Sequence, residues 1–388
     1  MADQPDGRVP RVSQRLPDFP WDHLTPYAAA AREHPDGLVD LSVGTPVDST
    51  PRLVQEALQS AANSPGYPLT VGLEATRRAC VDWLRRSAGA VDLGLDAVLP
   101  VIGTKELIAT LPLHLGLGPG DLVVHPTLAY PTYEVGTRLA GARSMATDSL
   151  VALGPETPAL LWVNSPSNPT GRILPVDHLR KVVDWCRQRG TVLVSDECYL
   201  EYAWEARSVS VLHPEVCGGS VEGILSVHSL SKRSNLAGYR CGFVAGDPAL
   251  VAELLAVRKN LGLQMPGPQQ RAMIAALEDD GHVADQHARY AGRRALLREA
   301  LLAAGFRIDH SEGSLYLWAS RDEDCWDTVA WCAGRGILVA PGSFYGAAGR
   351  RHVRVALTAT DERVAAAVAR LTTDSEGHPD QQTGGGCG

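Results

Sequence analysis

The chain has 388 residues, of which 45% are hydrophobic and 21% charged, an ordinary globular composition in a chain too long for one simple core. Its formal net charge of −8 argues against nucleic acid as a main partner, because phosphate binding needs a positive face. No apolar run reaches the roughly 20 residues that span a bilayer and no signal peptide is evident, so we expect a cytoplasmic protein.

Short apolar runs alternate with helical segments through the middle of the chain. Strands are predicted at 97–101, 121–125, 159–164, 191–195, 223–228 and 240–245, and helices at 105–115, 176–188, 248–260 and 283–304. Because strands that alternate with helices usually form parallel sheets, the pattern predicts an α/β fold with a mostly parallel central sheet flanked by helices.

The pattern changes from about residue 306 onward. Strands predicted at 306–310, 314–318, 337–340 and 352–357 indicate a smaller α+β unit. Residues 1–15 and 373–388 offer no apolar face to bury, and we expect both ends to be flexible.

Several classes of site have no supporting motif. The eight cysteines form no C-x-x-C pair, no His/Cys/Asp cluster has metal-ligand spacing, and no G-x-G-x-x-G follows the first strand. The sequence therefore predicts no metal site and no nicotinamide site of the Rossmann type. The cysteines are expected to be reduced and mostly buried.

Two strand ends carry the first candidate ligand groups. Gly103-Thr104-Lys105 follows the strand 97–101 and opens a helix, so its backbone N–H groups can face a phosphate, although Gly103 alone also suits an ordinary turn. Asp196 closes the apolar run 191–195, and ligand-binding groups in open α/β sheets lie at the carboxyl ends of strands. A helix N-cap is the alternative role for Asp196.

Lys232 stands out because the chain uses lysine sparingly, with arginine supplying 32 of the 36 basic residues. It lies in the stretch 229–240, which reads SLSKRSNLAGYR. A lysine amine can form a Schiff base with a carbonyl cofactor, whereas a guanidinium stays protonated and cannot. Lys105 is the competing lysine, and a solvated loop position is the alternative account of Lys232.

Five residues in this order resemble the class I and II aminotransferases, pyridoxal-phosphate enzymes of fold type I: Asn168, Asp196, Tyr199, Lys232 and Arg240. The resemblance covers roughly residues 20–372 and implies an aspartate-aminotransferase-like fold. It also implies a large cofactor-binding domain at 50–290 and a small domain made of 16–49 and 291–372.

The resemblance implies pyridoxal 5′-phosphate as cofactor and gives each matching residue a role. Lys232 would bond to the cofactor aldehyde and move the proton, while Asp196 pairs with the pyridine nitrogen. Asn168 and Tyr199 would contact the phenolic oxygen. Tyr130 would stack on the ring, with Tyr133 as an alternative that the sequence does not separate. The implied phosphate cup consists of Gly103, Thr104, Lys105, Ser229 and Arg240.

Three further roles follow from the same resemblance. Arg354, Asn168 and the backbone at Gly44 would hold the substrate carboxylate, although a surface ion pair is the plain alternative for Arg354. Tyr67 resembles the tyrosine that the neighbouring subunit donates to the phosphate, which implies a homodimer with shared active sites.

Phrases at 41–48, 103–107, 228–240 and 336–342 are similar to the actinobacterial N-succinyl-diaminopimelate aminotransferases. That subfamily implies amino transfer between L-glutamate and N-succinyl-2-amino-6-oxopimelate, giving N-succinyl-LL-2,6-diaminopimelate on the route to diaminopimelate and lysine. Such substrates carry several carboxylates, so we expect a basic pocket, with Arg233, Lys105, Arg258 and Lys259 as candidates.

Three alternatives stay open at this point. One is another class I specificity, for aspartate or for a broad range of amino acids. Another is a pyridoxal-phosphate C–S lyase of the same fold, which shares every cofactor residue. The third is a non-catalytic regulator, which is disfavoured because only about 20 residues precede the resemblance, where such regulators carry a DNA-binding domain.

Overall fold

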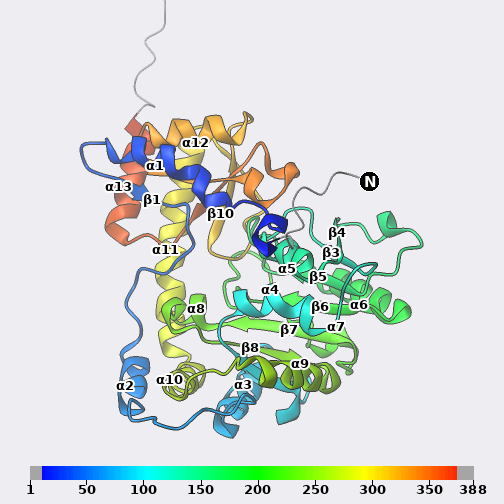
Figure 1. Ribbon diagram of the computed structural model, residues 1–388. Helices are drawn as coiled ribbons and strands as arrows, with labels where there is room; N and C mark the ends of the chain where they lie inside the picture. Colours follow the sequence, from blue (N-terminus) through cyan, green and yellow to red (C-terminus); the bar gives the residue numbers. More distant parts are fainter. Residues whose placement is uncertain (1–10, 374–388) are drawn as a thin grey trace, which may run out of the picture.

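The computed structural model describes residues 11–373 (Figure 1). The ends predicted to be flexible lie largely outside these residues. Within them, no helix combines the length and the apolar character that crossing a bilayer requires. The described cysteines are all free, and all but Cys198 are buried.

A seven-stranded sheet forms the centre of the molecule, in the order β2-β8-β7-β6-β5-β3-β4. Only β8 runs antiparallel to its neighbours, so the predicted mostly parallel sheet is confirmed. The strands are β2 (Val98–Val101), β3 (Leu122–His125), β4 (Arg143–Ala146), β5 (Leu160–Asn164), β6 (Val192–Asp196), β7 (Ile224–Ser229) and β8 (Gly242–Gly246).

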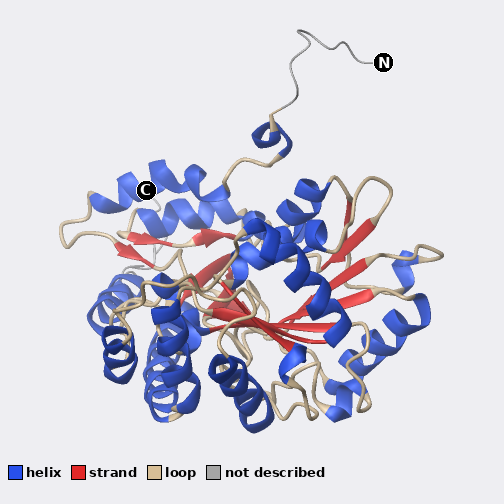
Figure 2. Cartoon of the chain, turned by 60° about the horizontal axis from the view of Figure 1, so that its bottom comes forward, coloured by secondary structure: helices blue, strands red, loops and turns tan. Residues whose placement is uncertain are grey.

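Helices cover both faces of this sheet (Figure 2). Successive side chains of a strand point to opposite faces, so Leu161 and Val163 join one hydrophobic cluster while Leu160 and Trp162 join another. The helices that contribute to the first cluster are α2 (Arg52–Ser60), α3 (Glu74–Ser87), α6 (Val176–Arg189), α7 (Pro214–Cys217) and α10 (Gly267–Glu278). Those of the second are α4 (Thr104–His114), α5 (Thr132–Ala140) and α9 (Pro248–Leu261).

A smaller unit holds a four-stranded antiparallel sheet in the order β12-β13-β10-β9. The N-terminal strand β1 (Val39–Asp40) pairs with β11 (Ile337–Leu338), which joins the start of the chain to this C-terminal unit. The other strands are β9 (Arg307–Asp309), β10 (Tyr316–Ser320), β12 (Ala340–Pro341) and β13 (Val353–Ala356). Its helices are α1 (Thr25–Arg32), α12 (Cys325–Ala333) and α13 (Asp361–Thr372).

The long helix α11 (Gly281–Ala303) leads from α10, beside the large sheet, to α13 in the small unit (Figure 1). The predicted domain boundary at residue 290 therefore falls inside one continuous helix. The division into 16–49 with 291–372, and 50–290, stays a prediction.

The parallel strands β5, β6 and β7 end at one edge of the large sheet. Asn164, the last residue of β5, lies opposite Asp196, the last residue of β6, in the strand register. The turn after β6 and the short helix α8 (Leu230–Arg233) after β7 therefore start side by side. This edge brings together the segments that carry the predicted site residues.

Candidate active site

A cavity of about 600 Å³ lies at the carboxyl edge of the central sheet. The N-terminal segment, the large sheet and the small sheet all contribute to its lining. Every predicted site residue lines it except Gly103 and Tyr67. The predicted residues in the lining are Gly44, Thr104, Lys105, Tyr130, Asn168, Asp196, Tyr199, Ser229, Lys232, Arg240 and Arg354.

Lys232 reaches into the cavity from α8. The side chain of Ser229 caps this short helix by accepting a hydrogen bond of 3.2 Å from the Ser231 N–H, and Lys232 Nζ donates to the carbonyl oxygen of Gly44. Burial lowers the pKa of Lys232, and the nearby cations Arg354 and Arg240 lower it further. The neutral amine, which is the nucleophilic form, is therefore easier to reach here than for a lysine in water.

Asp196 is a buried residue of the same cavity lining and is held by two donors. The hydroxyl of Tyr133 donates to Oδ2 at 2.7 Å, and the N–H of Cys198 donates to Oδ1 at 3.2 Å. Burial raises the pKa of this carboxyl, and the hydrogen bonds oppose that rise. Asp196 is thus a carboxyl group in apolar surroundings, and its two hydrogen-bond donors stabilise its charged form.

Tyr130 and Tyr133, which the sequence did not separate, take different places. Tyr130 lines the cavity, and burial raises its pKa to about 12. Tyr133 is fully buried, stacks on Trp162 with 4.8 Å between ring centroids, and bonds to Asp196. Of the two, only Tyr130 lines the cavity, and its stacking on the cofactor ring stays a prediction.

Arg354 and Asn168 meet across the two sheets. Arg354 Nη1 donates to Asn168 Oδ1 at 2.8 Å and Nη2 donates to the Ser42 carbonyl at 2.7 Å. Its Nε has no hydrogen-bond partner among the described residues, although the side chain is only 3% exposed. Arg354 also lines the cavity, where a guanidinium can pair with an incoming carboxylate.

The start of α4 and Arg240 form the end of the cavity that suits a phosphate. Gly103 has a φ of +91°, and a Cβ there would overlap the guanidinium of Arg240, so only glycine fits. No side chain caps α4, which leaves its first N–H groups free for an anion. The strand predicted at 240–245 begins at Gly242 instead, because Arg240 has a left-handed φ of 58° and lies in the preceding turn.

Tyr316 was not predicted as a site residue, yet it lines the cavity beside Tyr199. The two hydroxyls are 2.8 Å apart, and the Arg354 guanidinium lies 4.0 Å from the Tyr316 ring centroid. Tyr316 and Arg354 are diagonal neighbours in the antiparallel pair β10–β13. Finding Tyr316 requires this strand pairing, which one sequence does not reveal.

The mouth of the cavity is aromatic and basic. Phe19 and Trp21 line it from the N-terminal segment, with Phe19 half exposed. Lys105 Nζ lies 5.5 Å from the Phe19 ring centroid. No motif in the sequence marked Phe19 or Trp21, because an isolated aromatic in an irregular segment resembles any packing residue.

The donor set fits a phosphorylated aromatic aldehyde. The cavity offers an amine with a lowered pKa, a buried carboxyl and the three phenols of Tyr130, Tyr199 and Tyr316, together with an uncapped helix start beside a guanidinium. Its lining carries four basic side chains, Lys105, Lys232, Arg240 and Arg354, against the one carboxylate of Asp196. Among residues 11–373, no group of three or more His, Cys, Asp or Glu side chains is placed to hold a metal ion.

Comparisons with known proteins agree with this chemistry. The family model described as aminotransferase class I and II matches residues 36–371. A probable aminotransferase of Mycobacterium tuberculosis is 63% identical over 93% of this chain and 86% of its own length. The 4-dedimethylamino-4-oxo-anhydrotetracycline transaminase OxyQ of Streptomyces rimosus is 59% identical over 92% of this chain and 100% of its own.

A solved structure extends the comparison to the fold. The probable N-succinyldiaminopimelate aminotransferase of Thermus thermophilus superposes with a TM-score of 0.82 at 28% identity, covering 91% of this chain and 99% of that one. The fold of this chain is therefore the aspartate-aminotransferase-like fold type I.

Proposed function

The chain belongs to the class I and II aminotransferases, which depend on pyridoxal 5′-phosphate, and on this premise we propose which residues carry the reaction and which substrates it takes. The observation that carries the proposal is the lowered pKa of the Lys232 amine in the same cavity as buried Asp196. When bound, pyridoxal phosphate supplies an aldehyde for amines and a ring that withdraws electrons from the substrate Cα.

Each group of the cavity has a defined task in this proposal. Lys232 would hold the cofactor through its amine and would carry a proton to and from the substrate Cα. Asp196 holds the proton on the ring nitrogen, supported by the donor Tyr133. Tyr199 and Asn168 would hold the phenolic oxygen and Tyr130 would stack on the ring, because all three side chains belong to the cavity lining.

The two ends of the cavity bind the anionic groups. Arg240, Ser229, Thr104 and the free N–H groups at the start of α4 hold the phosphate. Arg354 would bind the substrate carboxylate from the cavity wall and orient the Cα–H bond, with the backbone at Gly44 close by.

The positions of the basic side chains also indicate which kind of substrate the cavity binds. Of the four candidates for a side-chain pocket, Arg233 and Arg258 are buried in ion pairs, with Glu201 and Glu106 respectively, and Lys259 does not line the cavity. Lys105 alone lies in the lining, at the mouth, where it faces the far end of a bound substrate. This supports a substrate with a distal carboxylate.

We therefore infer that the enzyme transfers an amino group between L-glutamate and N-succinyl-2-amino-6-oxopimelate, in diaminopimelate and lysine synthesis. The similarity to the probable N-succinyldiaminopimelate aminotransferase of Thermus thermophilus supports this choice. A second candidate acceptor is a polycyclic ketone. The aromatic mouth formed by Phe19 and Trp21, together with the similarity to OxyQ, favours that alternative.

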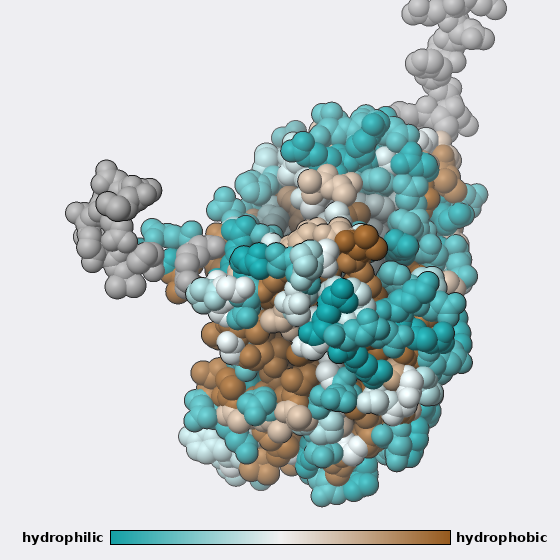
Figure 3. All heavy atoms as spheres, turned by 90° about the vertical axis from the view of Figure 1, so that its right-hand side faces the viewer, coloured by the Kyte–Doolittle hydropathy of each residue, from teal (hydrophilic) through white to brown (hydrophobic). Residues whose placement is uncertain are grey.

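The exposed apolar residues support a homodimer. Tyr67 is 98% exposed and Leu69 66% exposed, and Leu113 and Leu261 are more than half exposed. One side of the molecule shows hydrophobic residues gathered over much of its lower part (Figure 3). Apolar surface of this kind is typical of an interface, and we propose that it pairs two copies so that Tyr67 reaches the phosphate of the other copy.

The cofactor assignment is tested by trapping. Pyridoxal phosphate is added to purified protein, the mixture is reduced with borohydride, and the modified peptide is identified by mass spectrometry. We expect modification at residue 232 in the wild type and none in Lys232→Ala, whose turnover falls by about four orders of magnitude or more. Lys105→Ala removes the other lysine of the cavity lining and serves as the control, in which residue 232 should still be modified. A label on another lysine in the wild type contradicts the assignment.

The substrate assignment is tested by half-reactions of the loaded enzyme with N-succinyl-LL-diaminopimelate, glutamate and an amino-substituted anhydrotetracycline. We expect the succinylated diamine to react fastest. Lys105→Ala should weaken its binding by about tenfold, because one charged contact of about 1.4 kcal/mol is lost, whereas Lys259→Ala should not. A faster reaction of the tetracycline amine would select the polycyclic alternative.

A further inference from the structure

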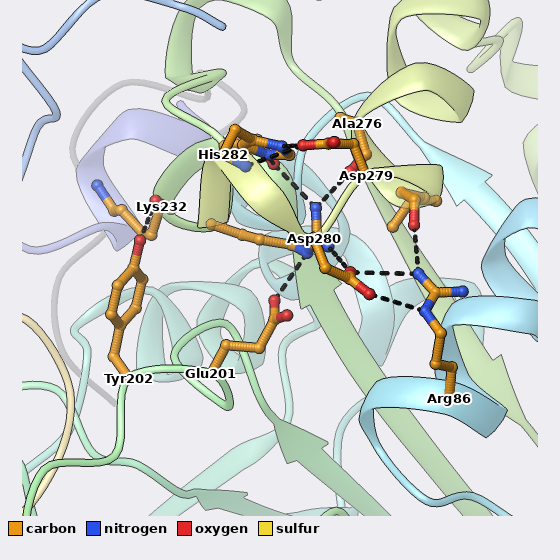
Figure 4. A network of polar contacts seen from close by, with 11 residues as sticks. Arg86, Glu201, Tyr202, Lys232, Ala276, Asp279, Asp280 and His282 are labelled. Carbon is orange, nitrogen blue, oxygen red and sulfur yellow. Dashed lines mark hydrogen bonds and ion pairs between the residues drawn. The ribbon is translucent and has the colours of Figure 1, made fainter. Parts of the chain in front are cut away.

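A polar network that includes the residue after Lys232 lies next to the Lys232 segment (Figure 4). Its centre is Arg233, the residue after Lys232, whose side chain is only 5% exposed. Arg233 Nε lies 2.7 Å from Glu201 Oε2, and Nη2 lies 3.1 Å from Asp280 Oδ1. Nη1 donates to the Ala276 carbonyl at 2.5 Å. One guanidinium thus contacts three separate segments of the chain.

The first of these segments also carries the cofactor groups. Glu201 and Tyr202 lie in the turn that follows β6, a few residues after Asp196 and Tyr199. Tyr202 donates a hydrogen bond of 2.8 Å to the backbone carbonyl of Lys232. Two contacts therefore join the turn that follows Asp196 to the helix that carries Lys232. One is the ion pair of Glu201 with Arg233, and the other is the hydrogen bond from Tyr202 to the Lys232 carbonyl.

The other segments belong to the junction of α10 and α11. Ala276 lies near the end of α10, and Asp280 directly precedes α11. Asp280 also pairs with Arg86 of α3 at 2.9 Å. His282 bonds to Asp279 at 2.6 Å and to Ser234 Oγ at 2.8 Å, which fixes the residue that follows Arg233. The Lys232 segment is thus fastened to the start of the helix that leads into the small unit.

Stability alone does not account for this network. Burying an arginine and a glutamate costs desolvation that their attraction roughly offsets, and replacing such a pair by apolar side chains is often neutral or stabilising. Burial indeed raises the pKa of Glu201, while Arg233 lowers it. Beyond the pairing of β6 with β7 and the hydrogen bond from Tyr202 to Lys232, the Arg233–Glu201 pair adds a contact that fixes the geometry between the two segments behind the strand ends.

We propose that Arg233 is a positioning residue, which with Glu201 and Tyr202 holds the Lys232 amine in register with Asp196. This inference rests on the proposed role of Lys232, and it adds which side chains hold the Lys232 backbone in place. A displacement of about 1 Å in a reacting group lowers a rate by up to about a hundredfold. Loss of the network should therefore slow the steps that use Lys232 and leave the binding of glutamate, which Arg354 governs, nearly unchanged.

Three variants test this role. The charge-neutral double variant R233M/E201M replaces the pair by apolar side chains of similar length. R233K keeps a positive charge for Glu201 but cannot also reach Ala276 and Asp280. R86Q is the matched control, because Arg86 touches Asp280 on the outer side of the network and contacts neither Lys232 nor Glu201.

Each protein is measured in three ways: unfolding temperature without cofactor, rate of borohydride-stable attachment after adding pyridoxal phosphate, and kcat and KM for glutamate. We expect R233M/E201M to attach the cofactor and turn over about tenfold to a hundredfold more slowly, with KM within about twofold of wild type. R233K should show a smaller loss of the same kind, and R86Q should match the wild type.

The outcomes separate the two proposals. If the wild type shows no attachment at Lys232, the proposed function fails. If the wild type attaches the cofactor there and both Arg233 variants match its attachment rate and kcat, the positioning role is wrong. Should the double variant not fold, R233K decides: wild-type attachment and kcat in R233K overturn the proposal, and a selective loss of both supports it.

Discussion

At the scale of single residues, burial sets the protonation of the site more than any neighbouring charge does. Desolvation is the largest effect on both Lys232 and Asp196, lowering the pKa of the amine and raising that of the carboxyl. A buried amine that is neutral is ready for carbonyl chemistry. A buried carboxyl that must stay charged needs donors, and for Asp196 these are Tyr133 and the backbone of Cys198.

Tyr133→Phe removes one of these donors without changing the shape of the core. Asp196 loses a hydrogen bond of 2.7 Å, worth about 1 kcal/mol, and its charged form is less favoured. We expect kcat to fall roughly fivefold, because Asp196 holds the ring proton less well. Steady-state rates measure this, and Tyr290→Phe, a buried tyrosine of α11 that does not line the cavity, is the control. Equal rates in Tyr133→Phe and wild type would refute the supporting role.

At the scale of elements, β6 and β7 carry a second buried acid and base one layer below the cavity. Glu197 follows β6, and its Oε2 lies 3.7 Å from Nε2 of His228 in β7. Its Oε1 accepts a hydrogen bond of 2.7 Å from the Val211 N–H. Burial raises the pKa of Glu197 to about 7 and lowers that of His228 to about 3. Both groups are therefore neutral near pH 6.

Glu197→Gln should change how stability depends on pH. The folded protein holds the Glu197 proton up to about pH 7, whereas the unfolded chain releases it near 4.5, so stability falls as the pH rises through this window. His228 acts oppositely, adding stability as the pH rises from about 3 to 6.5, and is unchanged in the variant. The full Glu197 shift corresponds to about 3 kcal/mol.

We therefore expect the stability of Glu197→Gln relative to wild type to increase by up to about 3 kcal/mol between pH 5 and pH 8. Urea unfolding of the cofactor-free proteins at both pH values measures the difference. Any constant cost of the altered hydrogen bonds cancels in this comparison. A difference that is the same at both pH values would show that Glu197 does not titrate in the folded protein near pH 7.

At the scale of the whole molecule, the features that could be predicted from the sequence are those that a local pattern of residues determines. The buried strands β2, β3, β5 and β6 are apolar along most of their length, and the strand ends mark where the site residues lie. The strand β4 was missed because its residues are largely exposed at the edge of the sheet. Tyr316 and the network around Arg233 depend on contacts between distant segments, such as Arg233 with Asp280, for which a single sequence gives no signal.

The proposed homodimer adds a prediction that only two copies together can test. If Tyr67 serves the site of the other copy, a dimer of one Lys232→Ala chain and one Tyr67→Ala chain contains one site with both residues intact. Random mixing makes half of the dimers mixed, so about a quarter of all sites should recover wild-type activity. The two variants are unfolded together, refolded and assayed.

A second mixture distinguishes shared sites from simple refolding. Lys232 and Asp196 line one cavity of a single chain, so each mixed dimer of Lys232→Ala with Asp196→Ala has a defect in both sites. This mixture should stay inactive while the Lys232→Ala and Tyr67→Ala mixture recovers. If the Lys232→Ala and Tyr67→Ala mixture shows only the mean activity of its two parents, Tyr67 does not serve the other copy's site, because an unshared site gains nothing from a partner with a different defect.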